Sequence, residues 1–420
     1  MKKYKLGDIC VFNAKTISRT ENILIDYLET SNLIKGQITN VQSVCLLDAP
    51  SRAQRQVRHH TILYSLVRPN QKHYGILSFP QENLVVSTGF ITIDVKPEYH
   101  CTIDPLYLYA MLTQDDMTEH LQTIAEGAVS SYPALLPSDI ANLEFDFPTF
   151  EIQRATSFFI DNLNRKIELN RAINHNLEAM AKQLYNYWFV QFDFPDENGR
   201  PYKSSGGKMV WNEKLKRDIP DGWGVAPLNR ELEIKSGYAF KSGSYSSEGM
   251  FKIITIKNVQ DGYLNISTCE CIKTLPKDIK KWCILQKGDR LISLTGNCGR
   301  VCRVTSEDLL LNQRVGVFCC DGLFSEYFYQ FLASDEGNHY CVNLANGAAQ
   351  ANLSPIDLCK MALVYPSRET LSLFNKTVKP IIQQYIANEQ KIENFTKLRD
   401  ELLPLLMNGQ VSVNYDLSCD

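Results

Sequence analysis

Apolar residues recur at alternating steps of four and three along residues 369–407. That spacing is the heptad pattern of a helix that packs along one stripe against another helix. An asparagine, Asn388, interrupts the stripe, and a polar residue in such a stripe fixes the register of the pairing at some cost in stability. The stripe consists of Phe374, Val378, Ile381, Tyr385, Asn388, Ile392, Phe395, Leu402 and Leu405.

The same pattern occurs earlier, in residues 151–189, at a constant offset, and Asn170 takes the place of Asn388. This copy consists of Ile160, Leu163, Ile167, Asn170, Leu177 and Leu184. A helix cannot bury one long apolar stripe alone, so the two copies predict a pair. An antiparallel pair would form a rod of about 55–60 Å with a domain at each end. A helix pair inside one larger domain is the alternative, and the charged outer face of the first helix counts against it.

The regions beside the two helices share a second set of landmarks. In the first region we expect strands at 61–67 and 83–95, then a helix at 105–112 with Asp104 as its cap and Pro105 in its first turn. The later region repeats these landmarks in order: 288–294 matches 60–66, 326–332 matches 106–112, and 356–358 matches 138–140. The chain therefore predicts an internal repeat with pseudo-two-fold symmetry.

The order of these features predicts an α+β protein, in which two mixed α/β domains are separated by two long helices that pair as an antiparallel coiled coil. The predicted boundaries are 1–148 for the first domain, 149–191 for the central helix, 192–224 for a linker rich in proline, glycine and serine, 225–366 for the second domain, 367–410 for the last helix and 411–420 for a tail.

Composition excludes little but narrows the setting. The 420 residues carry a net charge of −3 and contain no apolar run long enough for a membrane span, and no secretory signal is apparent. We therefore expect a cytoplasmic protein whose 13 cysteines are reduced thiols. Zinc binding is disfavoured because no Cys-x-x-Cys pair occurs, and the adjacent His59 and His60 would point to opposite faces of a strand.

Known catalytic signatures are missing from the sequence. It contains no phosphate-binding loop, no dinucleotide-binding glycine turn, no zinc-protease helix and no Gly-x-Ser-x-Gly elbow. We therefore expect no catalytic residue, no bound metal and no cofactor in this chain. The pattern favours a binding protein.

Candidate nucleic-acid contacts gather in two regions. No acidic residue lies between Asp48 and Glu82, and arginine interleaved with polar and aromatic residues is suited to phosphates and base edges. A solvated basic loop is the alternative. The candidates in the first domain are Arg52, Arg55, Arg58, Tyr64, Arg68, Lys72, His73 and Thr88, and those in the second are Tyr238, Phe240, Lys241, Lys257, Asn258, Thr295, Asn297, Arg300, Gln313 and Arg314.

Several short motifs together resemble the specificity subunit of type I restriction-modification enzymes, the HsdS family. Residues 166–170, 177–181 and 188–189 are similar to the family's central spacer helix, and 219–223 to the entry of its second recognition domain. Residues 398–404 with 408–409 are similar to its terminal helix. Residues 87–90 and 238–242 are similar to short sequence motifs that are common in its recognition domains.

This resemblance implies a non-catalytic subunit with two target recognition domains, which read a bipartite, asymmetric sequence in double-stranded DNA. It also implies two methyltransferase subunits, which use S-adenosylmethionine to methylate adenine, and restriction subunits that use ATP and Mg. Base contacts in the family lie in variable loops, so the resemblance assigns no single residue. The alternatives are a coiled-coil scaffold with peptide- or RNA-binding end domains, and an enzyme that uses the thiols.

Overall fold

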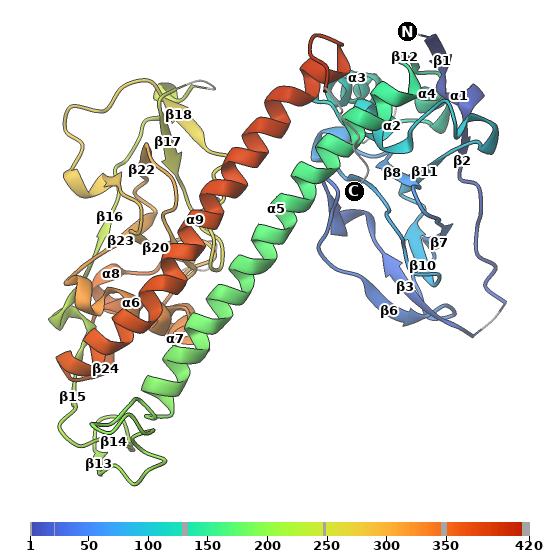
Figure 1. Cartoon of the computed structure of the whole chain (residues 1–420). Helices are drawn as coiled ribbons and strands as arrows, with labels where there is room; N and C mark the ends of the chain where they lie inside the picture. Colours follow the sequence, from blue (N-terminus) through green and yellow to red (C-terminus); the bar gives the residue numbers. More distant parts are fainter. Residues whose placement is uncertain (1, 21, 128–132, 247–248, 346–350, 414–420) are drawn as a thin grey trace. The chain divides into compact units, whose positions relative to one another are not determined.

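The computed structural model describes residues 2–20, 22–127, 133–246, 249–345 and 351–413, and the chain folds into two compact units (Figure 1). The first unit comprises Met1–Lys166 together with Phe395–Asp420, and the second comprises Ile167–Asn394. Each long helix therefore contributes one of its ends to each unit. The division into compact units cuts through both long helices, so it does not test the predicted domain boundaries, which remain predictions.

Two four-stranded sheets form the centre of the first unit. One has the order β2-β11-β8-β9 and the other β6-β3-β10-β7. Their strands are β2 (Cys10–Phe12), β3 (Leu24–Leu28), β6 (Gln42–Cys45), β7 (Ala53–Gln56), β8 (Ile62–Ser65), β9 (Tyr74–Ile76), β10 (Leu84–Ser87) and β11 (Phe90–Val95). The predicted strands at 61–67 and 83–95 thus correspond to β8, β10 and β11.

Short helices cover the first of these sheets, and their apolar faces form the largest core of the unit with it. Asp104 caps α2 as predicted, because its carboxylate accepts a hydrogen bond from the Tyr107 amide at 2.9 Å. The remaining elements are α1 (Leu6–Ile9), α2 (Pro105–Leu112), α3 (Asp115–Glu126), α4 (Pro137–Ala141), the paired strands β1 (Lys2–Lys5) and β12 (Glu144–Phe147), and the hairpin of β4 (Leu33–Ile34) and β5 (Gln37–Ile38).

The second unit repeats this topology strand for strand. Its sheets have the orders β16-β23-β20-β21 and β18-β17-β22-β19. The strands are β16 (Leu232–Ser236), β17 (Phe251–Ile254), β18 (Glu270–Ile272), β19 (Ile284–Leu285), β20 (Arg290–Ser293), β21 (Val301–Arg303), β22 (Leu309–Leu311) and β23 (Val315–Cys320), and the helices are α6 (Gly322–Leu332), α7 (Asp335–Leu344) and α8 (Pro355–Leu358). The strands β15 (Gly224–Pro227) and β24 (Ala362–Tyr365) pair as β1 and β12 do.

Pairing directions agree between the two units as well. Strands β3 and β10 are parallel in one unit, and β17 and β22 are parallel in the other, while the remaining pairs of these sheets are antiparallel. The internal repeat predicted from a few landmarks is therefore confirmed at the level of sheet topology.

The helix α5 (Phe150–Tyr185), which ends in a π-helical turn at Asn186–Val190, and the helix α9 (Arg368–Met407) are the two predicted long helices. In the first unit, Arg399 donates a hydrogen bond to the side-chain oxygen of Asn164 at 3.0 Å. In the second unit, Asn388 donates to Asn174 at 3.1 Å. Lys166 also lies over the Phe395 ring in the first unit, and Trp188 lies against Phe374 in the second. In each unit the contacted residue number on α9 falls as the number on α5 rises, so the helix ends pair antiparallel, as predicted.

The register of this pairing corrects the sequence interpretation. Asn388 is 1 % exposed and contacts Asn174, whereas Asn170, predicted as the equivalent register residue of α5, lies one turn earlier and is half-buried. Steps of seven from Ile167 lead to Asn174 and Ala181, which are both buried, but the apolar pattern does not mark them because neither is a large apolar residue. At the end of α9, Leu406 is buried where Leu405 was expected, and Leu405 is partly exposed.

The other predicted stripe residues lie on the packed side of their helices. All of them are buried or half-buried: Ile160, Leu163, Ile167, Leu177 and Leu184 on α5, and Phe374, Val378, Ile381, Tyr385, Ile392, Phe395 and Leu402 on α9.

The segment predicted as a linker is folded onto the second unit. The strands β13 (Met209–Asn212) and β14 (Arg217–Pro220) form a hairpin, and a small core of Phe192, Ile219 and Val364 attaches the segment to β24. Its prolines and glycines serve turns within this folded segment.

One local expectation was wrong. The side chains of His59 and His60 do not point apart, because the two residues lie in a turn before β8 and their ring centroids are 3.6 Å apart. Within the described ranges, no helix is long and apolar enough to cross a membrane. Among the same residues, no group of three or more His, Cys, Asp or Glu side chains is arranged to hold a metal ion.

The asparagine pair makes the first testable prediction. Replacing Asn174 with alanine leaves the buried Asn388 amide without its acceptor, which should lower the free energy of unfolding by about 1–3 kcal/mol. The double replacement by leucine should be more stable than the single variant, because it removes both polar groups. Urea unfolding measures both. Asn176→Ala, at an exposed position on the same helix, is the control and should change the stability by less than about 0.5 kcal/mol.

Candidate nucleic-acid interface

Three strands of the second unit, β16, β20 and β22, end at one common edge, which we call the strand-end edge. The residues that follow β16, β20 and β22 are joined there by backbone hydrogen bonds. Tyr238 donates to Leu311 at 2.8 Å, Gln313 donates to Tyr238 at 3.0 Å, and Leu294 donates to Arg314 at 3.0 Å. Residues that are about 75 positions apart in the sequence therefore lie side by side at this edge.

Two neighbouring side chains at the strand-end edge are free to meet a ligand. Gln313 and Arg314 are both exposed, and Asn312 fixes the turn that presents them, because its side-chain oxygen accepts the Arg314 amide at 3.3 Å. No acidic side chain among the described residues lies within ion-pair distance of Arg314. An amide beside a guanidinium can form bidentate hydrogen bonds with base edges, and the guanidinium also suits a phosphate.

A lysine-rich loop, residues 273–281, joins this edge. Tyr238 donates a hydrogen bond from its hydroxyl to Asp278 at 2.9 Å, and this bond raises the pKa of Tyr238. Asp278 is the only acid in a loop that carries four exposed lysines, namely Lys273, Lys277, Lys280 and Lys281. The sequence interpretation missed the loop, although four lysines within nine residues were a readable signal.

Other candidates in the second unit have different environments. The Asn258 side chain is 1 % exposed and builds the turn after β17: it accepts the Thr255 amide at 2.8 Å and donates to Asn265 at 2.9 Å. The Thr295 hydroxyl is buried and donates to Asn352 at 3.2 Å. These two side chains are satisfied inside the fold, so we exclude them from the exposed surface.

The remaining candidates of this unit are either held by neighbouring residues or exposed. Arg300 donates to Gln260 at 2.9 Å and pairs with Asp261 at 3.4 Å, which holds it against the neighbouring turn. Phe240 packs against the ring of Tyr238 with centroids 5.0 Å apart. The exposed candidates here are Lys241, Lys257 and Asn297.

The first unit brings three of its candidates to the corresponding edge. Thr88 donates from its amide to Arg52 at 2.8 Å, and Leu66, which precedes Arg68 by two residues, donates to Gly89 at 3.3 Å. Arg52 and Arg68 are exposed. Arg68 has a φ of 50°, a left-handed conformation that a non-glycine residue seldom adopts.

The predicted basic stretch does not act as one surface. Strand β7 separates Arg52 from Arg58, whose Nε pairs with the buried Asp94 at 3.0 Å near the opposite end of β11. Arg55 lies between them, half-buried, and burial lowers the pKa of its guanidinium. Three arginines that are close in sequence are thus spread along a strand, because consecutive residues of a strand extend about 3.3 Å each.

Tyr64, Lys72 and His73 also have internal contacts. Tyr64 is 1 % exposed and stacks on Tyr74 with centroids 5.6 Å apart, and burial raises its pKa to about 12. Lys72 pairs with Asp115, and a ring nitrogen of His73 lies 2.8 Å from the Leu33 carbonyl oxygen. The fold therefore accounts for these three residues without a ligand.

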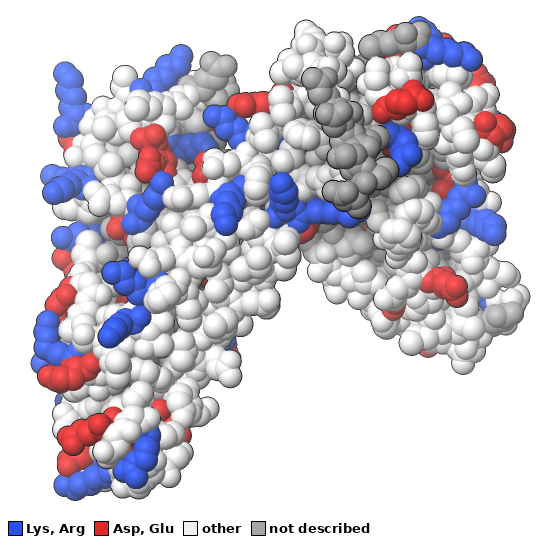
Figure 2. All heavy atoms as spheres, viewed as in Figure 1, with Lys and Arg blue, Asp and Glu red and all other residues white. Residues whose placement is uncertain are grey.

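Charge on the molecular surface is mixed. On the face drawn in Figure 2, Lys and Arg side chains are scattered among Asp and Glu side chains instead of forming one continuous basic field. This agrees with the net charge of −3. A nucleic-acid interface in this protein has to depend on local groups such as the strand-end edge and the lysine-rich loop.

Comparison with known proteins gives the same picture over most of the chain. The family model described as type I restriction modification DNA specificity domain matches residues 1–179 and again 220–401. The chain is similar to the HindI specificity subunit of Haemophilus influenzae, with 25 % identity over 98 % of this chain and 99 % of that protein. It is also similar to the MjaIX specificity subunit of Methanocaldococcus jannaschii, with 24 % identity over 81 % of this chain and 76 % of that protein.

A solved structure shares the fold. The S subunit of a type I restriction-modification system from M. genitalium matches with a TM-score of 0.54 and 15 % identity, over 96 % of this chain and 95 % of that one. The family model covers both repeats and more than half of the residues. The duplicated sheets, the two paired helices and these matches together show that the chain belongs to the type I restriction-modification DNA specificity family.

Proposed function

We propose that this chain is a specificity subunit that reads a bipartite, asymmetric sequence in double-stranded DNA. One observation carries the proposal: the same fold occurs twice, and the corresponding edge carries different side chains in each copy. A duplicated frame with unlike contact residues suits two unlike half-sites. Nothing in the comparisons supports the alternative of a scaffold with peptide- or RNA-binding ends.

The side chains at the strand-end edge suit different parts of DNA. Gln313 suits the two hydrogen-bonding groups that adenine presents in the major groove, and Arg314 suits guanine or a phosphate. The lysine-rich loop beside Tyr238 supplies positive charge for phosphates, which set the affinity but carry no sequence information. In the first unit, Arg52, Arg68 and Thr88 take the corresponding place.

The rest of the enzyme is proposed from the family. The paired helices hold the two half-sites at a set spacing and bind two methyltransferase subunits. Those partners bind S-adenosylmethionine and methylate adenine, while restriction subunits supply cleavage that needs ATP and Mg. This chain contributes recognition and no catalysis. Co-purification with a methyltransferase and with double-stranded DNA tests this assignment directly.

The second prediction concerns phosphate contacts. Arg52→Ala and Arg314→Ala should each weaken binding to every DNA sequence and lower the slope of log affinity against log salt by about 0.9, the value for one lost phosphate contact. Arg200→Ala is the matched control, because Arg200 is already paired with Asp196 and lies in the hairpin segment, so the slope should stay unchanged. Titrations from 50 to about 200 mM salt measure it. An unchanged slope for both edge variants would contradict this interface.

The third prediction concerns base readout. Gln313→Ala should relax the preference at one position of one half-site by about 1–3 kcal/mol and leave the other half-site unchanged. The preference is read from competition binding with a library randomised at each position. The double variant Lys277→Ala and Lys280→Ala provides the contrast, since loss of phosphate contacts should weaken all sequences alike. Equal weakening of all sequences by Gln313→Ala would exclude it from base readout.

The fourth prediction concerns spacing. One extra heptad in each helix, after Asn170 in α5 and after Lys391 in α9, preserves the pairing because these points face each other in the Asn174–Asn388 register. Seven residues lengthen the pair by about 10 Å, so the preferred spacing should grow by about three base pairs. Sequencing of methylated bases in cells gives the new target. A heptad in α5 alone shifts the register and should abolish assembly, and an unchanged spacing in the double variant would refute the role of the helices.

A further inference from the structure

A buried ionic cluster lies where the recognition domain of the second unit meets the two long helices. Arg303, on β21, is 1 % exposed, and its guanidinium contacts the Glu326 carboxylate at 2.5 Å. Glu326 lies on α6 and also pairs with Arg290 at 3.0 Å and with the Gln330 amide at 2.8 Å. Within the domain, both arginines are therefore paired with Glu326, as a buried charge requires, although the Nε atoms of Arg290 and Arg303 are buried without a hydrogen-bond partner.

The same guanidinium reaches both helices. Its other nitrogen, Nη1, lies 3.6 Å from the Glu178 carboxylate on α5. Its plane lies against the ring of Tyr329 at 3.7 Å, with Tyr385 of α9 at 6.0 Å. Tyr385 in turn donates its hydroxyl to the Gly262 carbonyl at 3.0 Å. One side chain thus links the domain core to a carboxylate on a helix.

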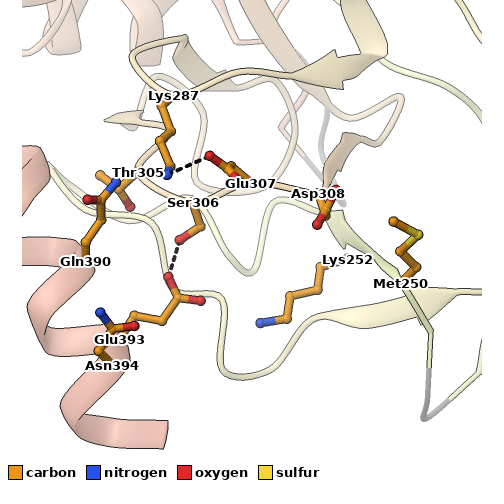
Figure 3. Close-up of a pocket in the computed structure, with 10 residues that line it drawn as sticks. All are labelled: Met250, Lys252, Lys287, Thr305, Ser306, Glu307, Asp308, Gln390, Glu393 and Asn394. Atoms are coloured by element: carbon orange, nitrogen blue, oxygen red, sulfur yellow. Dashed lines mark hydrogen bonds and ion pairs between the residues drawn. The ribbon is translucent and has the colours of Figure 1, made fainter.

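Polar contacts continue beside this cluster. Figure 3 shows Ser306 reaching from the domain to Glu393 on α9, a hydrogen bond of 2.7 Å. A pocket of about 430 Å³ opens at this point, and Lys252 extends into it from β17 toward the helix. Beside this pocket, the domain contacts α9 through the directed hydrogen bond from Ser306 to Glu393. Such bonds depend on orientation more strongly than apolar contacts do.

In the described part of the first unit, apolar residues stand at the corresponding place. Arg290 and Arg303 face each other across β20 and β21, and the pair at this position of β8 and β9 is Ile62 and Ile76. Sheet topology is identical in the two units, so an apolar pair suffices for the fold. The ionic cluster in the second unit therefore requires an explanation other than folding.

The balance of charges in the cluster is uneven. Two arginines, Arg290 and Arg303, pair with the carboxylates of Glu326 and Glu178, and a third carboxylate, Glu389, lies near enough to Glu178 to raise its pKa. Burial raises the pKa of Glu178 to about 7; Arg303 opposes this shift, while Glu389 and Glu326 add to it. Burial also raises the pKa of Glu389. The titratable or charged groups facing Glu178 are Cys302 and Arg303 on β21, Glu326 and Tyr329 on α6, and Tyr385 and Glu389 on α9.

We infer that Arg303 is a positioning residue: by holding Glu326 and Glu178 at once, it fixes the orientation of the second recognition domain on the helix pair and so narrows the spacing of half-sites that the protein accepts. This rests on the proposed function. A buried ion pair adds little net stability but demands a defined geometry, which an apolar contact does not. Glu178 is the helix side of the link.

Glu178→Gln is the decisive variant, because it removes the charge on the helix and leaves the pair of Arg303 and Glu326 intact. Asp335→Asn is the matched control. Asp335 also pairs with α5, through Lys182 at 3.2 Å, but its side chain is 98 % exposed. The full complex with its methyltransferase subunits is titrated with duplexes that carry the target found by sequencing methylated bases, at the native spacing and at one base pair more or less.

The affinity ratio between the native and altered spacings should fall about fivefold or more in Glu178→Gln and stay unchanged in Asp335→Asn. A Glu178→Gln variant that keeps the wild-type ratio, or weakens all spacings equally, would overturn the inference. If the wild type itself shows no preference for sequence or spacing, the proposed function fails instead. The two failures are thus separate.

Proton binding supplies a second readout. As the pH falls from 8 to 6, Glu178 gains a proton in the folded protein, so the spacing ratio of the wild type should decrease toward that of Glu178→Gln. Stability should move the other way. The folded-state pKa is raised above the ordinary value of 4.5, so the folded state binds more protons, and the wild type should lose stability relative to Glu178→Gln as the pH rises from 5 to 8. If Glu178 had only a structural role, the spacing ratio and the stability would change in the same direction with pH. That result would overturn the inference.

Discussion

Each long helix has one apolar stripe that it cannot bury alone, and the rest of the molecule depends on how the two helices solve this problem together. Pairing buries Ile167 of α5 and Val378 of α9 and places Asn174 against Asn388. The asparagine pair excludes other registers, because a shift by one turn would leave both amides buried without partners. Each unit then builds its sheets and short helices against one end of each helix.

The sequence predicted the features that follow from periodicity and order. Heptad spacing located both helices, the order of domains and helices along the chain indicated their antiparallel pairing, and a few landmarks such as Asp104 and Pro105 indicated the repeat. It did not indicate which asparagine fills the register position, because Asn174 and Ala181 interrupt an apolar stripe in the same way as surface residues do. Burial of these residues depends on the partner helix, which the pattern of one helix does not contain.

The candidate site was less predictable, for a physical reason. Arg52, Arg55 and Arg58 are close in sequence, but Arg52 precedes β7 and Arg58 follows it, so these two lie near different edges. Conversely, Tyr238 and Gln313 meet only because the ends of β16 and β22 lie together. Buried Asn258 shows the same limit, since a polar residue that builds a turn looks in sequence like one that meets a ligand. Sheet topology therefore decides which of these side chains meet at the candidate site.

The first unit has a pair of isoleucines where the second has a pair of arginines, and this difference affects how such proteins can diversify. The two recognition domains share one topology, so an exchange of domains by recombination would preserve the fold. The contact between domain and helix would not transfer. A domain carrying Ile62 and Ile76 at the second position would leave the half-buried carboxylate of Glu178 facing an apolar strand, without the guanidinium of Arg303. Exchange of a whole domain therefore favours breakpoints that carry its helix residues along, and residues on the helices become part of the heritable unit of specificity.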